Sequence, residues 1–262
     1  METLVVFLVT GAAAGVLAGL FGVGGGLIIV PALAIILPKL GTAPEVVMQS
    51  AIGTSLAVIG LTGISSTRSH HARGGVIWPI FWQLAPGIVI GSLIGATVAH
   101  HVGSDTLKKC VGVGAMLISI QMLADAAPKA GRGAPGALGL GIVGTLIGGL
   151  SALIGIGGGS LTVPYLTACN IDMRRAVGTS AACGMPIAWA GAAGFACNGL
   201  GVPGLAPWSL GYVDIAAFAG IAVTSVLTAP LGARLAHGLP PKLLKRAFAI
   251  FLAGISLRML LS

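Results

Sequence analysis

Two glycine triplets, each inside a long apolar stretch, are the residues whose type and spacing point most clearly to chemistry. The chain reads FGVGGGLIIVP at residues 21–31 and IGIGGGSLTVP at residues 154–164, and six of the eleven positions are identical. Glycine weakens a helix by about 1 kcal/mol relative to alanine, and proline breaks or kinks one. A helix that restarts after such a run presents free backbone N–H groups and a positive dipole end, which together favour an anion.

A second repeated motif supplies hydroxyl groups that could complete an anion site. The chain reads AIGTSLA at residues 51–57 and AVGTSAA at residues 176–182, with five of seven positions identical. Hydroxyls there can donate to an oxyanion, or they can bond back to the backbone of their own helix, and the sequence leaves both roles open. Gln49 lies one turn before the first motif, and Ser160 follows the second triplet where the first half has Leu27. The hydroxyl residues of the two motifs are Thr54, Ser55, Thr179 and Ser180.

The elements that position these motifs are expected to cross a membrane. Hydrophobic residues make up 56% of the chain and charged residues 8%, against roughly 25% charged residues in soluble domains. A span of about 30 Å of hydrocarbon needs about 20 apolar residues. The composition therefore predicts an all-α integral membrane protein with about eight transmembrane segments. The expected segments are 4–37, 46–67, 76–100, 106–124, 137–169, 174–198, 208–237 and 242–261.

The chain is an internal duplication of four segments. Besides the glycine and GTS motifs, GATVAHHVGSDTLKK at residues 95–109 answers GARLAHGLPPKLLKR at residues 232–246, so three blocks recur in one order. We expect a first repeat over 1–127, a linker loop over 128–136 and a second repeat over 137–262. The first segment of each repeat exceeds 30 residues and is predicted to be interrupted at its glycines.

The relative orientation of the two repeats stays open at this stage. If all eight segments span, the halves are parallel, and eight basic residues lie on the inner side of the membrane and five on the outer side. If each glycine-rich segment is a re-entrant hairpin, each half has three spans, the halves are inverted, and the division is nine against four. The positive-inside rule allows both arrangements, and the matched basic loops favour the parallel one slightly.

Several other functions find little support in the sequence. The net charge of +8 comes from single or paired basic residues between apolar segments rather than from a basic stripe, so no nucleic-acid binding is expected. The four cysteines lack metal-ligand spacing, and we expect no metal and no cofactor. Neither a Ser-His-Asp set nor a carboxylate at the centre of a span is present, so the chain is not expected to be an enzyme.

The paired GxGGG…VP and GTS blocks, in an eight-segment chain of this size, resemble the sulfite exporter TauE/SafE family of bacterial membrane proteins. The resemblance covers essentially the whole chain. It implies transport of small anions, chiefly sulfite, sulfonates and related organosulfur compounds, across the cytoplasmic (inner) membrane. The binding residues that it implies are Gly24, Gly25, Gly26, Thr54 and Ser55 with Gly157, Gly158, Gly159, Thr179 and Ser180, to which Gln49 and Ser160 are added from their positions.

The expected function is therefore a transporter of a small sulfur-containing anion bound between the repeats, and the resemblance implies export. The expected partners are that anion and the lipid bilayer, and a homodimer is compatible with the sequence. Two alternatives stay open, a passive anion channel and a membrane-embedded sulfur carrier that uses Cys183, three residues after Ser180.

Overall fold

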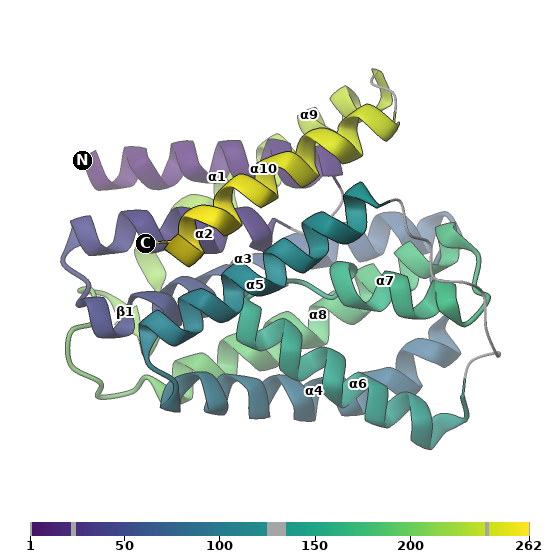
Figure 1. The fold of residues 1–262 in the computed structure, drawn as a ribbon, viewed down its shortest axis with the longest axis horizontal. Helices are drawn as coiled ribbons and strands as arrows, with labels where there is room; N and C mark the ends of the chain where they lie inside the picture. Colours follow the sequence, from purple (N-terminus) through teal and green to yellow (C-terminus); the bar gives the residue numbers. More distant parts are fainter. Residues whose placement is uncertain (1, 22–24, 125–134, 239–240, 262) are drawn as a thin grey trace.

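The protein folds into a bundle of helices that lie mostly along one long axis (Figure 1). The computed structural model describes residues 2–21, 25–124, 135–238 and 241–261. The helices are α1 (Glu2–Phe21), α2 (Gly26–Ile36), α3 (Val47–Ala72), α4 (Trp78–His101), α5 (Ser104–Leu123), α6 (Ala137–Ile154), α7 (Gly159–Ala168), α8 (Met173–Asn198), α9 (Ile215–Gly238) and α10 (Pro241–Leu261). Two short 3₁₀ helices, η1 (Leu37–Leu40) and η2 (Pro44–Val46), connect α2 to α3.

Both glycine-rich segments are divided into a long helix and a short one. Helix α1 ends at Phe21 and α2 begins at Gly26, while α6 ends at Ile154 and α7 begins at Gly159. Each short helix continues through its proline, Pro31 or Pro164. The glycines therefore end one helix and start the next, because their backbone accepts conformations that other residues avoid.

A short antiparallel hairpin departs from the all-α expectation. Strand β1 (Ser209–Leu210) pairs with β2 (Val213–Asp214), and Ser209 lies opposite Asp214. Gly211 in the turn has a φ of 54°, a conformation that glycine adopts without strain. The segment expected from residue 208 onward thus begins as a hairpin, and its helix α9 starts only at Ile215.

Helices from the two halves pair reciprocally. Helix α1 runs parallel to α9, with Gly11 against Thr224 and Gly15 against Thr228. The corresponding helices of the opposite halves, α4 and α6, are also parallel, with Gly87 against Gly141. Small residues let these backbones approach closely, as is typical of membrane helices. The pairs α3 with α8 and α5 with α10 are antiparallel, and each of them again joins one helix from each half.

This pairing inverts the two halves. Gly75, which follows α3, packs against Gly178 near the start of α8, so α3 ends where α8 begins. At the other end, the backbone N–H of Ala43 donates to the carbonyl oxygen of Gly204, which joins the connections before α3 and after α8. The parallel arrangement that the basic loops favour slightly is therefore wrong, because it would place the end of α3 and the start of α8 at opposite ends.

Each glycine-rich segment folds back within the bundle. Helix α1 runs away from the end where the N-terminus lies, and α2 with η1 returns to it (Figure 1). Helices α6 and α7 make the same reversal from the opposite end (Figure 1). The expected crossing of each glycine-rich segment as a single span is therefore corrected to a long helix followed by a returning half-length helix.

The surface of the bundle suits a bilayer. Five stretches of the described chain are long and apolar enough to cross a membrane: Pro44–Ala72, Trp78–His101, Ser104–Leu123, Ala137–Ile154 and Met173–Asn198. Large apolar side chains such as Leu117, Ile142 and Leu227 are more than half exposed on this surface. Water would penalise so many exposed leucines and isoleucines, whereas hydrocarbon does not.

Candidate functional site

The first break lies before α2. Gly25 adopts a left-handed conformation with a φ of 76°, and its carbonyl oxygen accepts 3.0 Å hydrogen bonds from the N–H groups of Ile28 and Ile29. Gly26 is buried as the first residue of α2. Gly24, the remaining glycine of this triplet, lies outside the described residues.

The second break spans residues 155–158. Gly155 ends α6 with a φ of 74°, and the carbonyl oxygen of Gly158 accepts a 2.9 Å hydrogen bond from the N–H of Thr162. A Cβ on Gly158 would come within 3.1 Å of the Gly184 nitrogen in α8, and one on Gly157 within 3.2 Å of the Ile59 side chain. A Cβ on Gly159 would meet nothing within 4 Å, so open space adjoins the first residue of α7.

The two breaks touch each other inside the bundle. A Cβ on Gly26 would collide with the carbonyl oxygen of Gly155, and one on Gly155 would collide with Val30 of α2. The Ser55 hydroxyl donates a 3.3 Å hydrogen bond to the same Gly155 oxygen. Gly155 was missed as a candidate from the sequence, although it is one of the six positions at which the two glycine blocks are identical.

The threonines of the GTS motifs hold the opposite half. Thr54 Oγ1 accepts a 3.0 Å hydrogen bond from the backbone N–H of Asp214, just before α9. Thr179 Oγ1 accepts a 2.9 Å hydrogen bond from the backbone N–H of Ile77, just before α4. Both threonines are fully buried. Each therefore joins its own half to a connection in the other half, and its hydroxyl hydrogen is left to donate elsewhere.

Gln49 lies at the end of the bundle, in the first turn of α3. Its Nε2 donates a 2.8 Å hydrogen bond to the carbonyl oxygen of Val102, which follows α4. Its Oε1 is buried and has no hydrogen-bond partner among the described residues. The structure thus places Gln49 about two turns from Ser55 along α3, and its amide anchors α4 rather than facing the breaks.

Three buried hydroxyls without a partner in the described chain lie on α7 and α8, with Ser160 and Thr162 on different sides of the first turn of α7. Ser160, Thr162 and Ser180 each carry a buried Oγ atom for which the described chain offers no hydrogen bond. Gly184 contacts Gly158, and Ser180 lies one turn away on the same face of α8. Because α7 and α8 are consecutive and reverse direction at residues 169–172, Ser180 lies level with the first turn of α7. A buried hydroxyl without a hydrogen-bond partner lowers the free energy of unfolding by about 1–3 kcal/mol. These hydroxyls can therefore donate to an acceptor that a ligand brings.

A cavity of about 200 Å³ adjoins the second break. Ile154 and Ile156, on either side of Gly155, form one wall, and Leu161 of α7 forms another. Ser151 of α6 also lines the cavity, and its hydroxyl is buried without a partner. The remaining lining residues are Gly114, Leu117, Ile118, Gln121 and Leu150. None of the candidate site residues lines this cavity, and Leu117 and Leu150 at its mouth are exposed on the outer surface of the bundle.

The residues that line this cavity carry no charged side chain. No group of three or more His, Cys, Asp or Glu side chains with metal-binding geometry occurs in the described ranges. Cys183 is fully buried in α8. An anion at this site would therefore rely on backbone N–H groups and hydroxyls, which act strongly where water is excluded.

The inverted halves, the paired helix breaks and the apolar surface define a helical membrane protein. A family model described as "Sulfite exporter TauE/SafE" matches residues 7–259. The chain belongs to this family. The resemblance inferred from the glycine and GTS motifs is therefore confirmed.

Relatives agree with this assignment. A "Probable membrane transporter protein" of Haemophilus influenzae is 38% identical over 255 residues, which are 97% of each chain. A protein of the same description from Methanocaldococcus jannaschii is 29% identical over 266 residues, covering 97% of this chain and 94% of the relative. No solved structure matches the chain significantly. The chain is thus a membrane transporter of the TauE/SafE type.

Proposed function

We propose that the protein transports small sulfur-containing anions, such as sulfite or sulfonates, and binds them at the second break. The single observation that supports this proposal is the pair of unpartnered hydroxyls at Thr162 and Ser180, which lie on the facing sides of α7 and α8, while Ser160 lies on another side of the first turn of α7. Sulfite and sulfonates offer several oxygen acceptors, which match donors that approach from two helices. The amide end of α7 adds its dipole, worth about 0.3–1 kcal/mol for a negative charge and more when buried.

The first break contributes to the same site through the contact between Gly26 and Gly155. In this proposal the glycines of both triplets expose backbone amides, while Ser55 fixes the carbonyl of Gly155. Thr54 and Thr179 act indirectly, because they hold the connections before α9 and α4 against the opposite half. Residues 1–127 and 137–262 then form the two repeats, with 128–136 as the linker.

We further propose that the molecule lies in the cytoplasmic membrane with its more basic end toward the cytoplasm. The end of α3 and the starts of α8 and α10 lie at that end (Figure 1). These stretches carry Arg68, Arg73, Arg174, Arg175, Lys242, Lys245 and Arg246, whereas Lys39, Lys108, Lys109 and Arg258 belong to the opposite end. The positive-inside rule then places both termini outside. Alkaline phosphatase fused to the C-terminus should be active, and an inactive fusion would reverse this orientation.

The experiment that tests the transport function is flux in vesicles. Purified protein reconstituted in liposomes should release trapped sulfite or methanesulfonate faster than empty liposomes, and the rate should saturate. Ser180→Ala should lower this flux because it removes one of the donors. A rate that never saturates would favour the passive channel instead, and an absence of flux for both anions would remove the proposal.

A further inference from the structure

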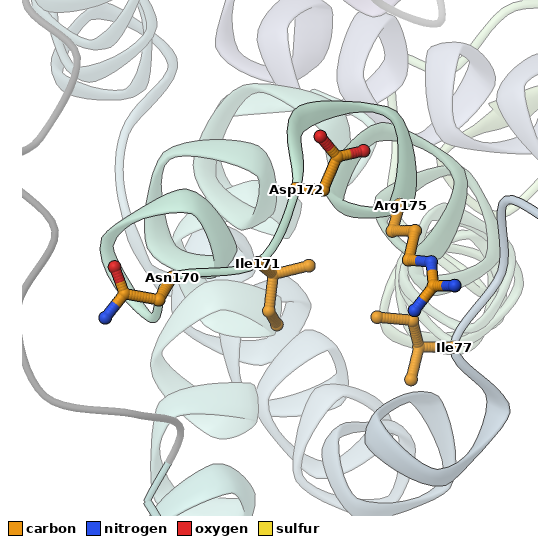
Figure 2. A pocket seen from close by; sticks show the side chains of 5 residues that line it. All are labelled: Ile77, Asn170, Ile171, Asp172 and Arg175. Atoms are coloured by element: carbon orange, nitrogen blue, oxygen red, sulfur yellow. The ribbon is translucent and has the colours of Figure 1, made fainter.

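A second cavity, of about 510 Å³, opens where the turn between α7 and α8 meets the start of α4 (Figure 2). Its lining residues are Ile77, Asn170, Ile171, Asp172 and Arg175. The cavity lies at the basic end of the bundle, since Arg174 beside it approaches Gly75 in the connection after α3. It is separate from the site at the breaks, because the two cavities share no lining residue.

Arg175 is the cationic group of this cavity. Its guanidinium extends toward Ile77, whereas the carboxylate of Asp172 points the other way (Figure 2). One oxygen of Asp172 accepts a 3.1 Å hydrogen bond from the N–H of Arg174, so this carboxylate caps α8. The Arg175 side chain is exposed and makes no ion pair or hydrogen bond with any residue that the structure describes. Its donors therefore face the cavity unpaired.

Arg175 does not stabilise helix α8. Arg174 and Arg175 both lie in the first turn of α8, where the helix dipole is positive and a cation is unfavourable by some tenths of a kcal/mol. Asp172 offsets only one of the two charges. At the position equivalent to Arg175 in the first half, α3 carries Ser50, which is buried. Of the two equivalent helices α3 and α8, only α8 therefore carries a cation at this position.

The cavity lies near the GTS motif of the second half in the chain and in space. Arg175 and Thr179 are four residues apart and share one face of α8. Ile77 lines the cavity and also donates its backbone N–H to Thr179 Oγ1. Ser180, with its unpartnered hydroxyl, is the next residue of α8. An anion held by Arg175 is therefore one to two helical turns from the donors around α7.

We propose that this cavity is a docking site at which Arg175 captures the anion before it moves to the second break. A planar guanidinium can bind two oxygens of a sulfite or sulfonate group at once. The inference rests on the proposed transport function, and it deepens that function by placing the loading site at the end assigned to the cytoplasm. Loading from that end corresponds to export.

The test compares Arg175→Gln with Arg174→Gln in reconstituted liposomes that carry sulfite. Both variants lose one positive charge in the same helical turn, but only Arg175 lines the cavity. Arg175→Gln should raise the half-saturating sulfite concentration about tenfold with the maximal rate retained, as expected for loss of a charged hydrogen bond. Arg174→Gln should change it by less than about twofold, and Arg175→Lys should restore part of the loss.

Ionic strength provides a readout that a merely structural role would not move. Salt screens an exposed cation. A higher salt concentration should therefore raise the half-saturating sulfite concentration of the unmodified protein more than that of the Arg175→Gln variant. Equal effects of the two glutamine substitutions would overturn the docking site while leaving the transport function in place. Absence of any anion flux in the unmodified protein would remove the transport function and the docking site with it.

Discussion

Thr54 in the first half accepts a 3.0 Å hydrogen bond from the backbone N–H of Asp214 in the second half. Thr179 repeats this contact in reverse, with Ile77 of the first half as its donor. The glycine before each threonine serves the same contact, since a Cβ on Gly53 or Gly178 would collide with the backbone of the opposite half. The GTS motifs are thus the paired joints that hold the inverted halves together.

Removing either threonine hydroxyl should destabilise the protein. Thr54→Val and Thr179→Val keep the shape of the side chain but remove the acceptor for the buried N–H of Asp214 or the half-buried N–H of Ile77. A loss of about 1–3 kcal/mol in the free energy of unfolding is expected for each. Thermal unfolding in detergent measures it, with Thr54→Ser and Thr179→Ser as controls that retain the acceptor. Equal stability of the valine and serine variants would argue against these joints.

Alanine substitutions at Ser55 and Ser180, the equivalent serines of the two GTS motifs, should have opposite effects on stability. Ser55 donates to the carbonyl oxygen of Gly155, so Ser55→Ala should lower stability by about 1 kcal/mol. Ser180 is buried without a partner, so Ser180→Ala should keep or raise stability by about 1 kcal/mol while sulfite flux falls. Thermal unfolding and liposome flux on the two variants check this. Destabilisation by Ser180→Ala would mean that its hydroxyl already has a partner.

The glycines should tolerate side chains unequally. Gly26→Leu and Gly158→Leu should abolish transport while expression stays measurable, because their side chains would enter the contacts with Gly155 and Gly184. Gly159→Ala should be accommodated, because nothing lies within 4 Å of the added carbon. Flux per amount of membrane-inserted protein is the measurement. Unchanged flux in both leucine variants would remove the glycine breaks from the mechanism.

Asp214 should make stability depend on pH. Burial raises the pKa of its carboxyl above the ordinary value, although hydrogen bonds from the backbone of Ala217 and Ala216 partly oppose this. The folded state therefore binds the proton more tightly than the unfolded chain. Its stabilising contribution is complete below the ordinary pKa of about 4 and is lost as the pH rises through the raised value. Unfolding of Asp214→Asn, whose amide oxygen still caps Ala217, should lack this fall; a parallel fall would assign it to another group.

The thiol of Cys183 should not react with thiol reagents in the folded protein. It is fully buried, whereas Cys110 and Cys197 are exposed. A membrane-permeant maleimide should therefore label Cys110 and Cys197 in the folded protein and leave Cys183 unmodified, as mass spectrometry of peptides would reveal. Full sulfite flux in Cys183→Ala would exclude the sulfur-carrier alternative, and loss of flux in a folded, membrane-inserted variant would revive it.

The glycine and hydroxyl residues show how far sequence reasoning reaches into the site. Both helix breaks occur at the predicted triplets, because a glycine run acts on the backbone locally. The spacing of Gln49 places it one turn before the first GTS motif, but it does not predict the hydrogen bond from its Nε2 to the carbonyl oxygen of Val102. Gly155 was overlooked because its importance comes from contacts with Gly26 and Ser55, which are more than 90 residues away.

The sequence by itself determined the membrane class, the family and the sites of the helix breaks, because hydrophobicity and glycine content act along the chain. Only the tertiary structure decided the relative orientation of the halves. The basic residues divided nearly as well for parallel as for inverted repeats, whereas the pairing of Gly75 with Gly178 permits only inversion. It also assigned Thr54 and Thr179 to joints between the halves, because a hydroxyl's partner depends on which backbone group packing brings within 3 Å.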